Sequence, residues 1–167
     1  MGKFRITQQF KLGDHDGLDL VGIDSKEIHS TVNGIVHYAG WENPNNYAQG
    51  FGKYVCIKAN NRYYYFGHMS EIKVNIGQSV KITDVIGIEG STGKSTGSHC
   101  HYEIRTSFMK NSPANVVNVC GVSGIPNTLN AVLDDGYRPP ASQPAKKQIK
   151  ITVDIDDHQY SGLITEV

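Results

Sequence analysis

The sequence has no excess of charge of either sign, since 16 basic and 16 acidic side chains among 167 residues give a formal net charge of zero. It has no long basic run either, so nothing favours a nucleic-acid groove or an anionic membrane surface. No segment approaches the roughly 18 apolar residues of a membrane-spanning helix. We therefore expect a domain that folds in water, with no nucleic-acid partner and no membrane span.

Cysteine is also scarce, and the three residues Cys56, Cys100 and Cys120 include no C-x-x-C spacing. Such a set argues against a disulfide framework and against a cysteine zinc site, so we expect small core residues. No apolar stretch follows Met1. This predicts a protein made in the cytoplasm without a signal peptide, which needs release to act outside the cell.

What is abundant is glycine, with 18 residues, among short β-branched and aromatic runs. This pattern favours many strands joined by tight turns. Asn33–Gly34 predicts a two-residue hairpin turn and Asn60–Asn61 a second turn. No run shows helical apolar spacing, so the sequence predicts an all-β fold with little helix. The expected strands are residues 5–10, 18–21, 35–41, 54–58, 63–66, 84–88 and 100–104.

Composition divides the chain into three parts. Residues 1–125 form the main domain, and residues 126–147 form a tail and a linker that contains prolines and lysines. Residues 148–167 alternate apolar and polar side chains around a polar turn, which predicts a short β-hairpin. Because one hairpin alone is marginally stable, it packs on something, pairs with another chain or begins a longer module.

Two pairs of residues, one of a histidine and an aspartate and one of two histidines, have the spacing of metal ligands. His15 and Asp19 are four residues apart, and His99 and His101 are two apart, which on a strand puts both on one face. A catalytic zinc needs about three protein ligands and one open position for water. Imidazole nitrogen and carboxylate oxygen both suit it. Cys100, on the opposite face, is expected to be buried packing.

Two polar segments lie close to these residues in the sequence. Residues 42–51 predict a long surface loop beside the site, suited to form a wall for a substrate. The glycine-rich run 90–97 lacks the spacing of a phosphate-binding loop, because Ile88 stands where a glycine is needed. The run is then either a flexible turn before a strand or a rim that lets a substrate backbone come close.

These stretches together resemble the M23 family of zinc metallopeptidases, the lysostaphin or LytM type, over about residues 6–118. The match lies in the order and spacing of several motifs, and it is far more specific than either ligand pair alone. The motifs are His15–Asp19 (HDGLD), Val32–Val36 (VNGIV), Tyr65–Ser70 (YFGHMS), Val74–Val80 (VNIGQSV) and Gly90–Arg105 (GSTGKSTGSHCHYEIR).

The resemblance implies a small antiparallel β-sheet domain with its site in a groove. It implies that His15, Asp19 and His101 hold Zn²⁺, and that His68 and His99 stand beside the open coordination position. The substrate it implies is a peptide of bacterial peptidoglycan, cut as by an endopeptidase.

Zinc hydrolysis also needs a base for the water and a donor to the developing oxyanion. The chain has no H-E-x-x-H motif, so histidine is the natural substitute for the glutamate base at neutral pH. We assign these two roles jointly to His68 and His99. Glu103 is expected either to orient a ligand or to be an exposed strand residue.

One departure from the family concerns a tyrosine that some members place shortly before the first ligand as an extra oxyanion donor. Phe10 stands in that neighbourhood and cannot donate a hydrogen bond. The role is then unfilled, or it is taken by Gln9 or by a loop tyrosine such as Tyr47. The remaining histidines, His29, His37 and His158, are expected to pack or to face solvent.

The leading hypothesis is a zinc-dependent peptidoglycan endopeptidase, either a phage-type lysin or a trimmed bacterial autolysin. The alternative is a non-catalytic member of the same fold that binds cell wall or regulates another hydrolase. The presence of all presumed ligands and of both auxiliary histidines favours the enzyme.

Overall fold

The structure is a computed structural model that describes residues 1–108, 112–134, 148–155 and 158–165. It divides into two compact units, Met1–Tyr137 and Arg138–Val167. Within the described residues, no helix is both long enough and apolar enough to cross a membrane.

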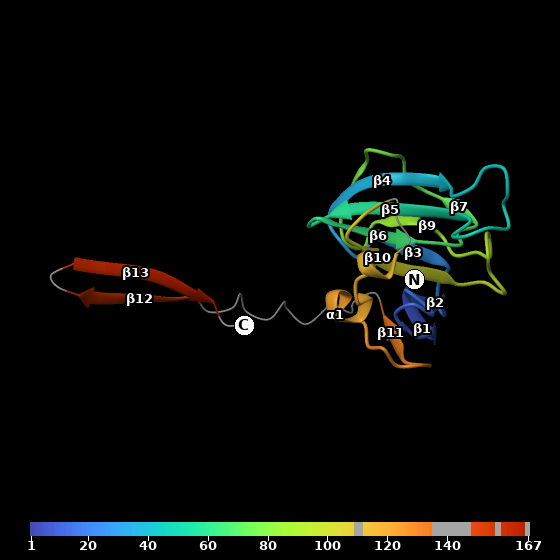
Figure 1. Ribbon diagram of the computed structural model, residues 1–167. Coiled ribbons are helices and arrows are strands. Elements are labelled where there is room, and N and C mark those ends of the chain that lie inside the picture. The colour runs from blue at the N-terminus through green and yellow to red at the C-terminus, as the bar shows by residue number, and fades with distance from the viewer. Residues whose placement is uncertain (109–111, 135–147, 156–157, 166–167) are drawn as a thin grey trace. The chain divides into compact units, whose positions relative to one another are not determined.

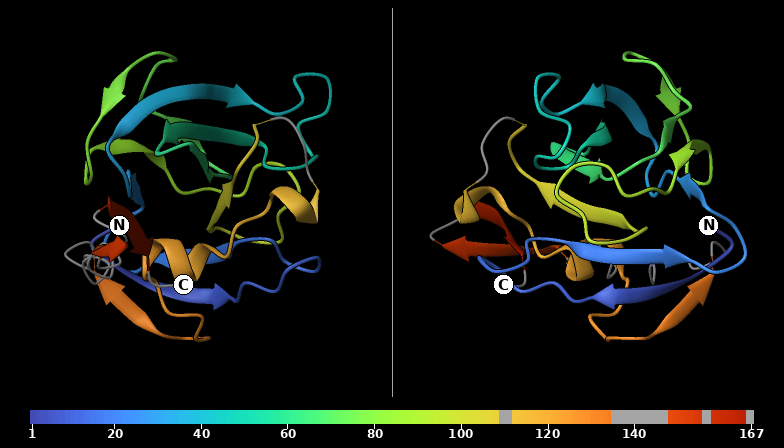
Figure 2. Two further views of the ribbon diagram at one scale, coloured as in Figure 1. Left: turned by 60° about the vertical axis from the view of Figure 1, so that its left-hand side comes forward. Right: turned by 90° about the vertical axis from the view of Figure 1, so that its right-hand side faces the viewer.

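The first unit is built on an eight-stranded antiparallel sheet that curls into a half-barrel, as Figure 2 shows. In spatial order its strands are β11 (Val132–Asp134), β1 (Lys3–Gln8), β2 (Leu18–Gly22), β10 (Cys100–Arg105), β6 (Arg62–Phe66), β5 (Lys53–Ala59), β4 (Gly34–Trp41) and β8 (Ser79–Val80). A small sheet contains β3 (Glu27–His29), β9 (Val85–Ile88) and β7 (Glu71–Ile72) (Figure 1).

Helix is confined to short pieces, within the ranges that the structure describes. These are the 3-10 helix Pro113–Asn115 and helix α1 (Val119–Ser123). Asn118 caps α1 through its side-chain oxygen, and Gly124 ends it with a left-handed backbone. The predicted all-β, antiparallel fold with little helix is confirmed.

Side chains along β2 and β10 point alternately to the two faces of the sheet, so core residues lie on one face and site residues on the other. Leu18 and Leu20 of β2, and Tyr102 and Ile104 of β10, belong to the main hydrophobic core. The residues between them point to the other face of the sheet, because successive strand residues alternate. This places Asp19 of β2 on the face opposite the core, together with the odd-numbered residues of β10.

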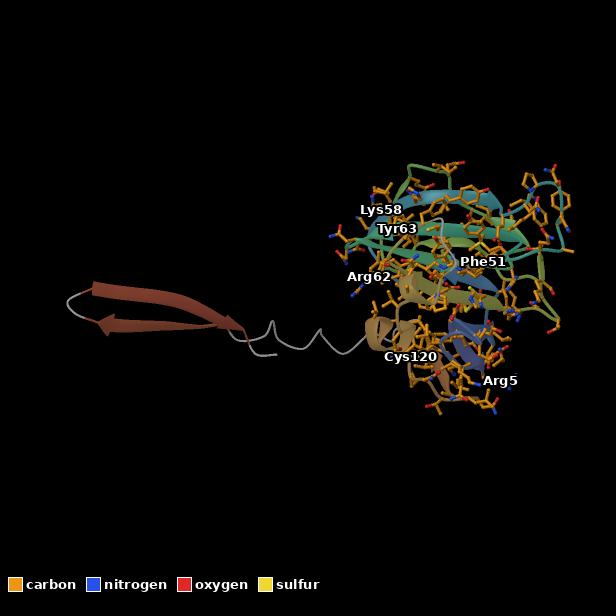
Figure 3. All side chains as sticks on the ribbon, viewed as in Figure 1. Arg5, Phe51, Lys58, Arg62, Tyr63 and Cys120 are labelled. Carbon is orange, nitrogen blue, oxygen red and sulfur yellow. The ribbon has the colours of Figure 1, made fainter. Side chains whose placement is uncertain are left out.

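A second, aromatic cluster covers part of that opposite face. Tyr54, Cys56 and Tyr65 are buried there, and Phe51 packs against them. Figure 3 labels Phe51 over the sheet. The aromatic cluster thus covers β5 and β6 on this face and leaves the part over β2 and β10 open.

Of the two predicted turns, one is confirmed and the other is wrong. Asn60 and Asn61 both have positive φ and join β5 to β6, and Figure 3 shows Lys58, Arg62 and Tyr63 gathered at this end. By contrast, β3 pairs with β9, and β4 pairs with β5 and β8, so Asn33–Gly34 joins no hairpin.

Packing explains why an Asn-Gly pair stands at this position without forming a hairpin. The Asn33 side-chain oxygen accepts a hydrogen bond from the Ile82 amide at 2.9 Å. A Cβ on Gly34 would lie 2.6 Å from the carbonyl oxygen of Lys58, so the glycine allows close approach to β5.

The three cysteines are free thiols, as expected. Cys56 and Cys100 are buried, and Cys120 is half-buried on α1 (Figure 3).

Past residue 125 the chain still packs on the sheet, because Asn130 donates to the Ile6 carbonyl and β11 pairs with β1. Residues 130–134 thus belong to the sheet of the first unit, and the boundary at 125 stays a prediction.

The second unit contains one antiparallel hairpin of β12 (Gln148–Ile155) and β13 (His158–Thr165), paired from Gln148↔Thr165 to Ile155↔His158. The predicted hairpin is confirmed. The linker predicted at 138–147 lies outside the described residues, as does the side chain of His158.

Candidate metal centre

Three side chains from distant parts of the chain converge on the open face of the sheet. The register of β2 and β10 sets Asp19 directly opposite His101, and His15 comes from the turn that precedes β2. Asp19 Oδ1 lies 2.9 Å from His101 Nδ1 and 3.1 Å from His15 Nε2. The two imidazole nitrogens are 3.2 Å apart. A Cβ on the intervening Gly17 would lie 2.6 Å from the His101 ring, so glycine is needed there.

The second nitrogen of each imidazole is anchored elsewhere. His15 Nδ1 lies 2.8 Å from the carbonyl oxygen of Gln9, and His101 Nε2 lies 3.2 Å from Glu103 Oε2. Both partners are acceptors, so each of these nitrogens carries a proton. The other nitrogen of each ring faces Asp19, where it can donate to the carboxylate or, in the neutral ring, bind a metal ion. Two imidazole lone pairs and a carboxylate within 4.8 Å of one another fit a divalent metal ion.

Glu103 is buried, not exposed, since only 2% of it is accessible. Its other carboxylate oxygen accepts a hydrogen bond from the Arg105 guanidinium. That guanidinium lies 5.2 Å from the Phe51 ring and 4.7 Å from the Tyr65 ring. Of the two alternatives considered for Glu103, orientation of a ligand therefore agrees with the structure.

The charges of this cluster are strongly coupled. Burial acts to raise the pKa of Asp19, but hydrogen bonds from His101 and His15 hold that pKa well below its usual range. Burial also disfavours a charged His101, yet hydrogen bonds to Asp19 and Glu103 outweigh it and raise its pKa to about 9. The carboxylates thus favour a positive charge at the centre of the cluster.

The two auxiliary histidines lie beside these three residues. The rings of His68 and His99 are 4.6 Å apart, and the ring of His68 is 6.0 Å from that of His101. His99 Nε2 is 3.5 Å from Asp19 Oδ2. The structure therefore brings together all five residues that the sequence singled out.

His68 is held in an unusual backbone conformation, with a φ of 62°. Its amide donates to the Phe51 carbonyl at 2.7 Å, and its Nδ1 faces the Thr92 carbonyl at 2.7 Å. Burial lowers the pKa of His68 to about 4. The ring is therefore neutral near pH 7, with its proton on Nδ1 and its lone pair on Nε2.

His99 is oriented by the end of the glycine-rich run. Its Nδ1 lies 2.8 Å from the Gly97 carbonyl and 3.4 Å from the Ser95 hydroxyl. One nitrogen of His99 thus faces a carbonyl, and the other faces the carboxylate of Asp19.

All five side chains line one cavity of about 740 Å³. The two predicted polar segments contribute to its walls and are joined to each other. Gly93 donates to the Tyr47 carbonyl and Lys94 to the Gly50 carbonyl. Gly52 and Gly93 meet so closely that a Cβ on Gly93 would lie 2.2 Å from the Gly52 nitrogen. The other lining residues are Gln8, Asp14, Asp16, Glu42, Ala48, Gly50, Phe51, Gly93, Lys94, Ser95, Thr96, Glu103 and Arg105.

Neither residue considered as a substitute oxyanion donor lines this cavity. The Gln9 amide donates to the Asn127 carbonyl at 2.7 Å, and the Tyr47 ring stacks on Trp41. Gln8 does line it, opposite Asp19 in the register of β1 and β2. The sequence pattern missed Gln8. The predicted strand ran from residue 5 to 10, whereas β1 ends at Gln8, and the direction of the Gln8 side chain follows from the pairing of β1 with β2.

The other described histidines lie outside the cavity lining. His29 Nδ1 is 3.3 Å from the amino group of Met1. His37 is exposed, and its ring packs edge-on against Tyr63 and Phe108. Both agree with the expected packing or solvent-facing roles.

Comparison with known proteins identifies the family of the chain. The model of Peptidase family M23 matches residues 13–116, which is more than half of the chain and includes all five residues. Glycyl-glycine endopeptidase ALE-1 of Staphylococcus capitis is 30% identical over 104 residues, covering 61% of this chain and 27% of that protein. Peptidoglycan DD-endopeptidase ShyA of Vibrio cholerae is 29% identical over 137 residues, covering 74% and 30%.

Two solved structures resemble the fold. One is a single-substitution variant of the catalytic domain of the prophage-encoded M23 protein EnpA from Enterococcus faecalis, with 31% identity, a TM-score of 0.54, and 68% and 86% of the two chains covered. The other is the catalytic domain of lysostaphin from Staphylococcus simulans, with 27% identity, a TM-score of 0.53, and 69% and 86% covered. The chain spans less than a third of the curated relatives that it matches, between 22% and 30% of their length. With the motif order, the ligand geometry and the family match in agreement, the chain belongs to peptidase family M23.

Proposed function

We propose that the chain is a zinc-dependent endopeptidase that hydrolyses peptide bonds in the peptide part of bacterial peptidoglycan. The observation that carries the proposal is the convergence of His15, Asp19 and His101, with both imidazoles anchored through their second nitrogens. Membership of the M23 family and the names of the relatives, a glycyl-glycine endopeptidase and a peptidoglycan DD-endopeptidase, support the substrate class.

Zinc is the metal that this donor set suits best. Two imidazole nitrogens and one carboxylate oxygen are three ligands, which is the number that catalytic zinc sites use when a fourth position stays open. When bound, zinc supplies a water with a pKa of about 7 and a Lewis acid for the scissile carbonyl.

The two auxiliary histidines then have different roles. His68 is neutral, and its Nε2 lone pair has no hydrogen-bond partner among the described residues, so it accepts the proton of the attacking water. His99 has Nδ1 2.8 Å from the Gly97 carbonyl oxygen and Nε2 3.5 Å from Asp19 Oδ2, so both of its nitrogens face hydrogen-bond acceptors. We assign His99 as the donor to the substrate oxygen that becomes negative.

The test combines metal content with product analysis. Purified chain is assayed for zinc and incubated with sacculi of two kinds, one with glycine cross-bridges and one with direct cross-links, and the fragments are identified by mass spectrometry. We expect about one zinc per chain, new peptide termini from at least one kind of sacculus, and loss of activity with a chelator that added zinc reverses.

Asp19→Ala is the control for this assay, because it removes a ligand and should lose both zinc and hydrolysis. Zinc-loaded chain that binds sacculi without releasing peptide would overturn the proposal in favour of the non-catalytic alternative.

We also propose that the chain acts in the manner of a phage lysin, reaching the wall after release from the cell or in a virion. The prophage-encoded EnpA protein among its structural relatives supports this setting. Lysis of susceptible cells by chain added from outside is the expected behaviour. Susceptible cells that stay intact when the chain is added from outside would contradict it.

A further inference from the structure

Two aromatic side chains, Trp41 at the end of β4 and Tyr47 on the loop that follows, form a stack outside the metal centre. The rings of Trp41 and Tyr47 are 4.1 Å apart with an angle of 30° between their planes. The Lys53 ammonium lies 5.4 Å from the Trp41 ring. Tyr47 remains 57% exposed and is absent from the residues that line the cavity. Trp41 therefore covers one face of the Tyr47 ring, and the other face is open to a ligand.

The loop that carries Tyr47 is fixed at the rim of the cavity. Glu42 donates from its amide to the Gly52 carbonyl at 2.8 Å, which closes the base of the loop. The carbonyl of Tyr47 accepts a hydrogen bond from Gly93 at 3.1 Å, and both Gly93 and the adjacent Ala48 line the cavity. The open ring face is thus preorganised directly beside the groove, so binding there costs little ordering of the loop.

The loop segment that carries this ring has no charged side chain and is rich in side-chain amides. Residues 43–52 contain three asparagines and one glutamine but no acidic or basic side chain. The side-chain oxygens of Asn46 and Gln49 each accept one bond within the loop. Their NH₂ groups have no hydrogen-bond partner among the described residues, so they are available as donors.

This chemistry differs from that of the cavity, where Asp14, Asp16 and Lys94 give the walls charge. An open aromatic face is electron-rich and attracts the slightly positive C–H groups on the flat face of a pyranose ring. Free amide donors match sugar hydroxyls and N-acetyl carbonyls. A neutral N-acetylated sugar fits this surface better than the charged ends of a peptide.

We propose that Tyr47, supported by Trp41, is a binding platform for an N-acetylated sugar of the glycan strand, at the rim of the groove that takes the attached peptide. The inference rests on the proposed function for its substrate, but it assigns a separate site. Tyr47 would hold the glycan while hydrolysis takes place in the cavity.

The direct test needs no hydrolysis. Trp41 is the only tryptophan of the chain, so intrinsic fluorescence reports on the stack itself. Titration with chitotetraose, a linear oligomer of N-acetylglucosamine, should change the emission of Trp41 in a saturable way. Tyr47→Ala should abolish the saturable change, whereas Tyr47→Phe keeps the ring and should retain it. No saturable change with the wild-type chain, or an equal response from Tyr47→Ala, would overturn the proposal.

A second measurement relates the platform to catalysis. Hydrolysis of intact sacculi is compared with hydrolysis of cross-linked peptides released from the same sacculi by an amidase, which carry the same bond without sugar. Tyr47→Ala should lower kcat/KM on sacculi about three- to tenfold and leave the sugar-free peptides unaffected, with Tyr47→Phe close to wild type on both.

The outcomes separate the two proposals. Equal losses on both substrates would make Tyr47 part of the peptide wall and overturn the sugar platform. Absence of hydrolysis by the wild-type chain on both would overturn the proposed function, while the fluorescence titration still decides the platform.

Discussion

At the scale of single residues, the metal centre depends on side chains that are each held from two sides. His101 directs one nitrogen at Asp19 and anchors the other on Glu103, which Arg105 holds in turn. His15 is anchored in the same way on a backbone carbonyl. Such anchoring fixes the ring orientation before a metal arrives, so its loss should weaken metal binding without removing a ligand.

The substitution Glu103→Gln tests this anchoring. Glutamine keeps the shape of the side chain but not its charge, so we expect zinc affinity to fall about 10- to 100-fold with one zinc still bound at saturation. Competition with a chromophoric chelator measures the affinity. Glu71→Gln, the same change on β7 outside the cavity lining, is the matched control and should bind zinc like wild type. An unchanged affinity in Glu103→Gln would show that the anchor is dispensable.

His68→Ala separates proton transfer from metal binding. We expect the variant to keep its zinc and to lose about 10²- to 10⁴-fold in kcat, because the ring accepts a proton without being a ligand. Metal analysis and turnover on sacculi, measured on the same preparation, check both parts. Full turnover in this variant would contradict the role given to His68.

The raised pKa of His101 predicts how metal affinity varies with pH. In the metal-free chain this ring keeps its proton up to a pKa of about 9, and a metal ion must displace that proton. Apparent zinc affinity should therefore rise about tenfold per pH unit between pH 7 and 9 and level off above that range. Competition titrations, corrected for protonation of the chelator, measure this, and a flat profile would contradict the coupling.

The sequence predicted the five site residues and, as one of two alternatives, the supporting role of Glu103, but not the other groups that support the site. The ligands are identifiable because their spacing is local and their chemistry is specific. Gln8 lies in the cavity because it pairs with Asp19, and this pairing depends on which strands become neighbours. Arg105 is two residues from Glu103 on the same strand, but its contacts with the rings of Phe51 and Tyr65 also depend on how the sheet assembles. The sequence pattern does not give these neighbours.

At the scale of elements, the two loops that line the cavity, residues 42–51 and 90–97, are held together by close backbone contact between Gly52 and Gly93. Gly93→Ala places a side chain at a φ of 75° and against the backbone of Gly52, which should cost about 1–3 kcal/mol of stability. It should also lower turnover, because the carbonyl of neighbouring Thr92 holds His68. Urea unfolding and activity measure the two effects.

Gly97→Ala is the control within the same run, since nothing lies within 4 Å of its Cβ position. It should be nearly neutral for stability. Equal stability of the two variants would contradict the close contact between the loops.

The strands that the sequence predicted are the long ones with clear alternation or apolar runs. The elements it missed are short: β7 and β8 have two residues each, β3, β11 and the 3-10 helix have three each, and α1 has five. Such pieces carry too little pattern of their own and form because the rest of the sheet offers them a partner. The Asn33–Gly34 error has the same origin, since β3 finds its partner in β9 and not in the next strand along the chain.

At the scale of the whole molecule, the core and the site belong to one unit. Every described residue of the core clusters and of the metal centre lies within Met1–Tyr137. We therefore expect a chain ending at residue 137 to keep the melting temperature and the zinc affinity of the full chain. A chain ending at residue 125 loses β11 and the bonds to Ile6, and should melt about 5–10 °C lower. Thermal scans of both chains check this, and equal melting temperatures would contradict it.

The antiparallel register that sets Asp19 against His101 also has a consequence for the order of folding events. The two residues are 82 positions apart, so the ligand set assembles only after a long loop has closed and β2 has paired with β10. The rate of zinc binding during refolding therefore reports the rate of this pairing. A stopped-flow zinc indicator should report a late phase that coincides with the last gain of β structure.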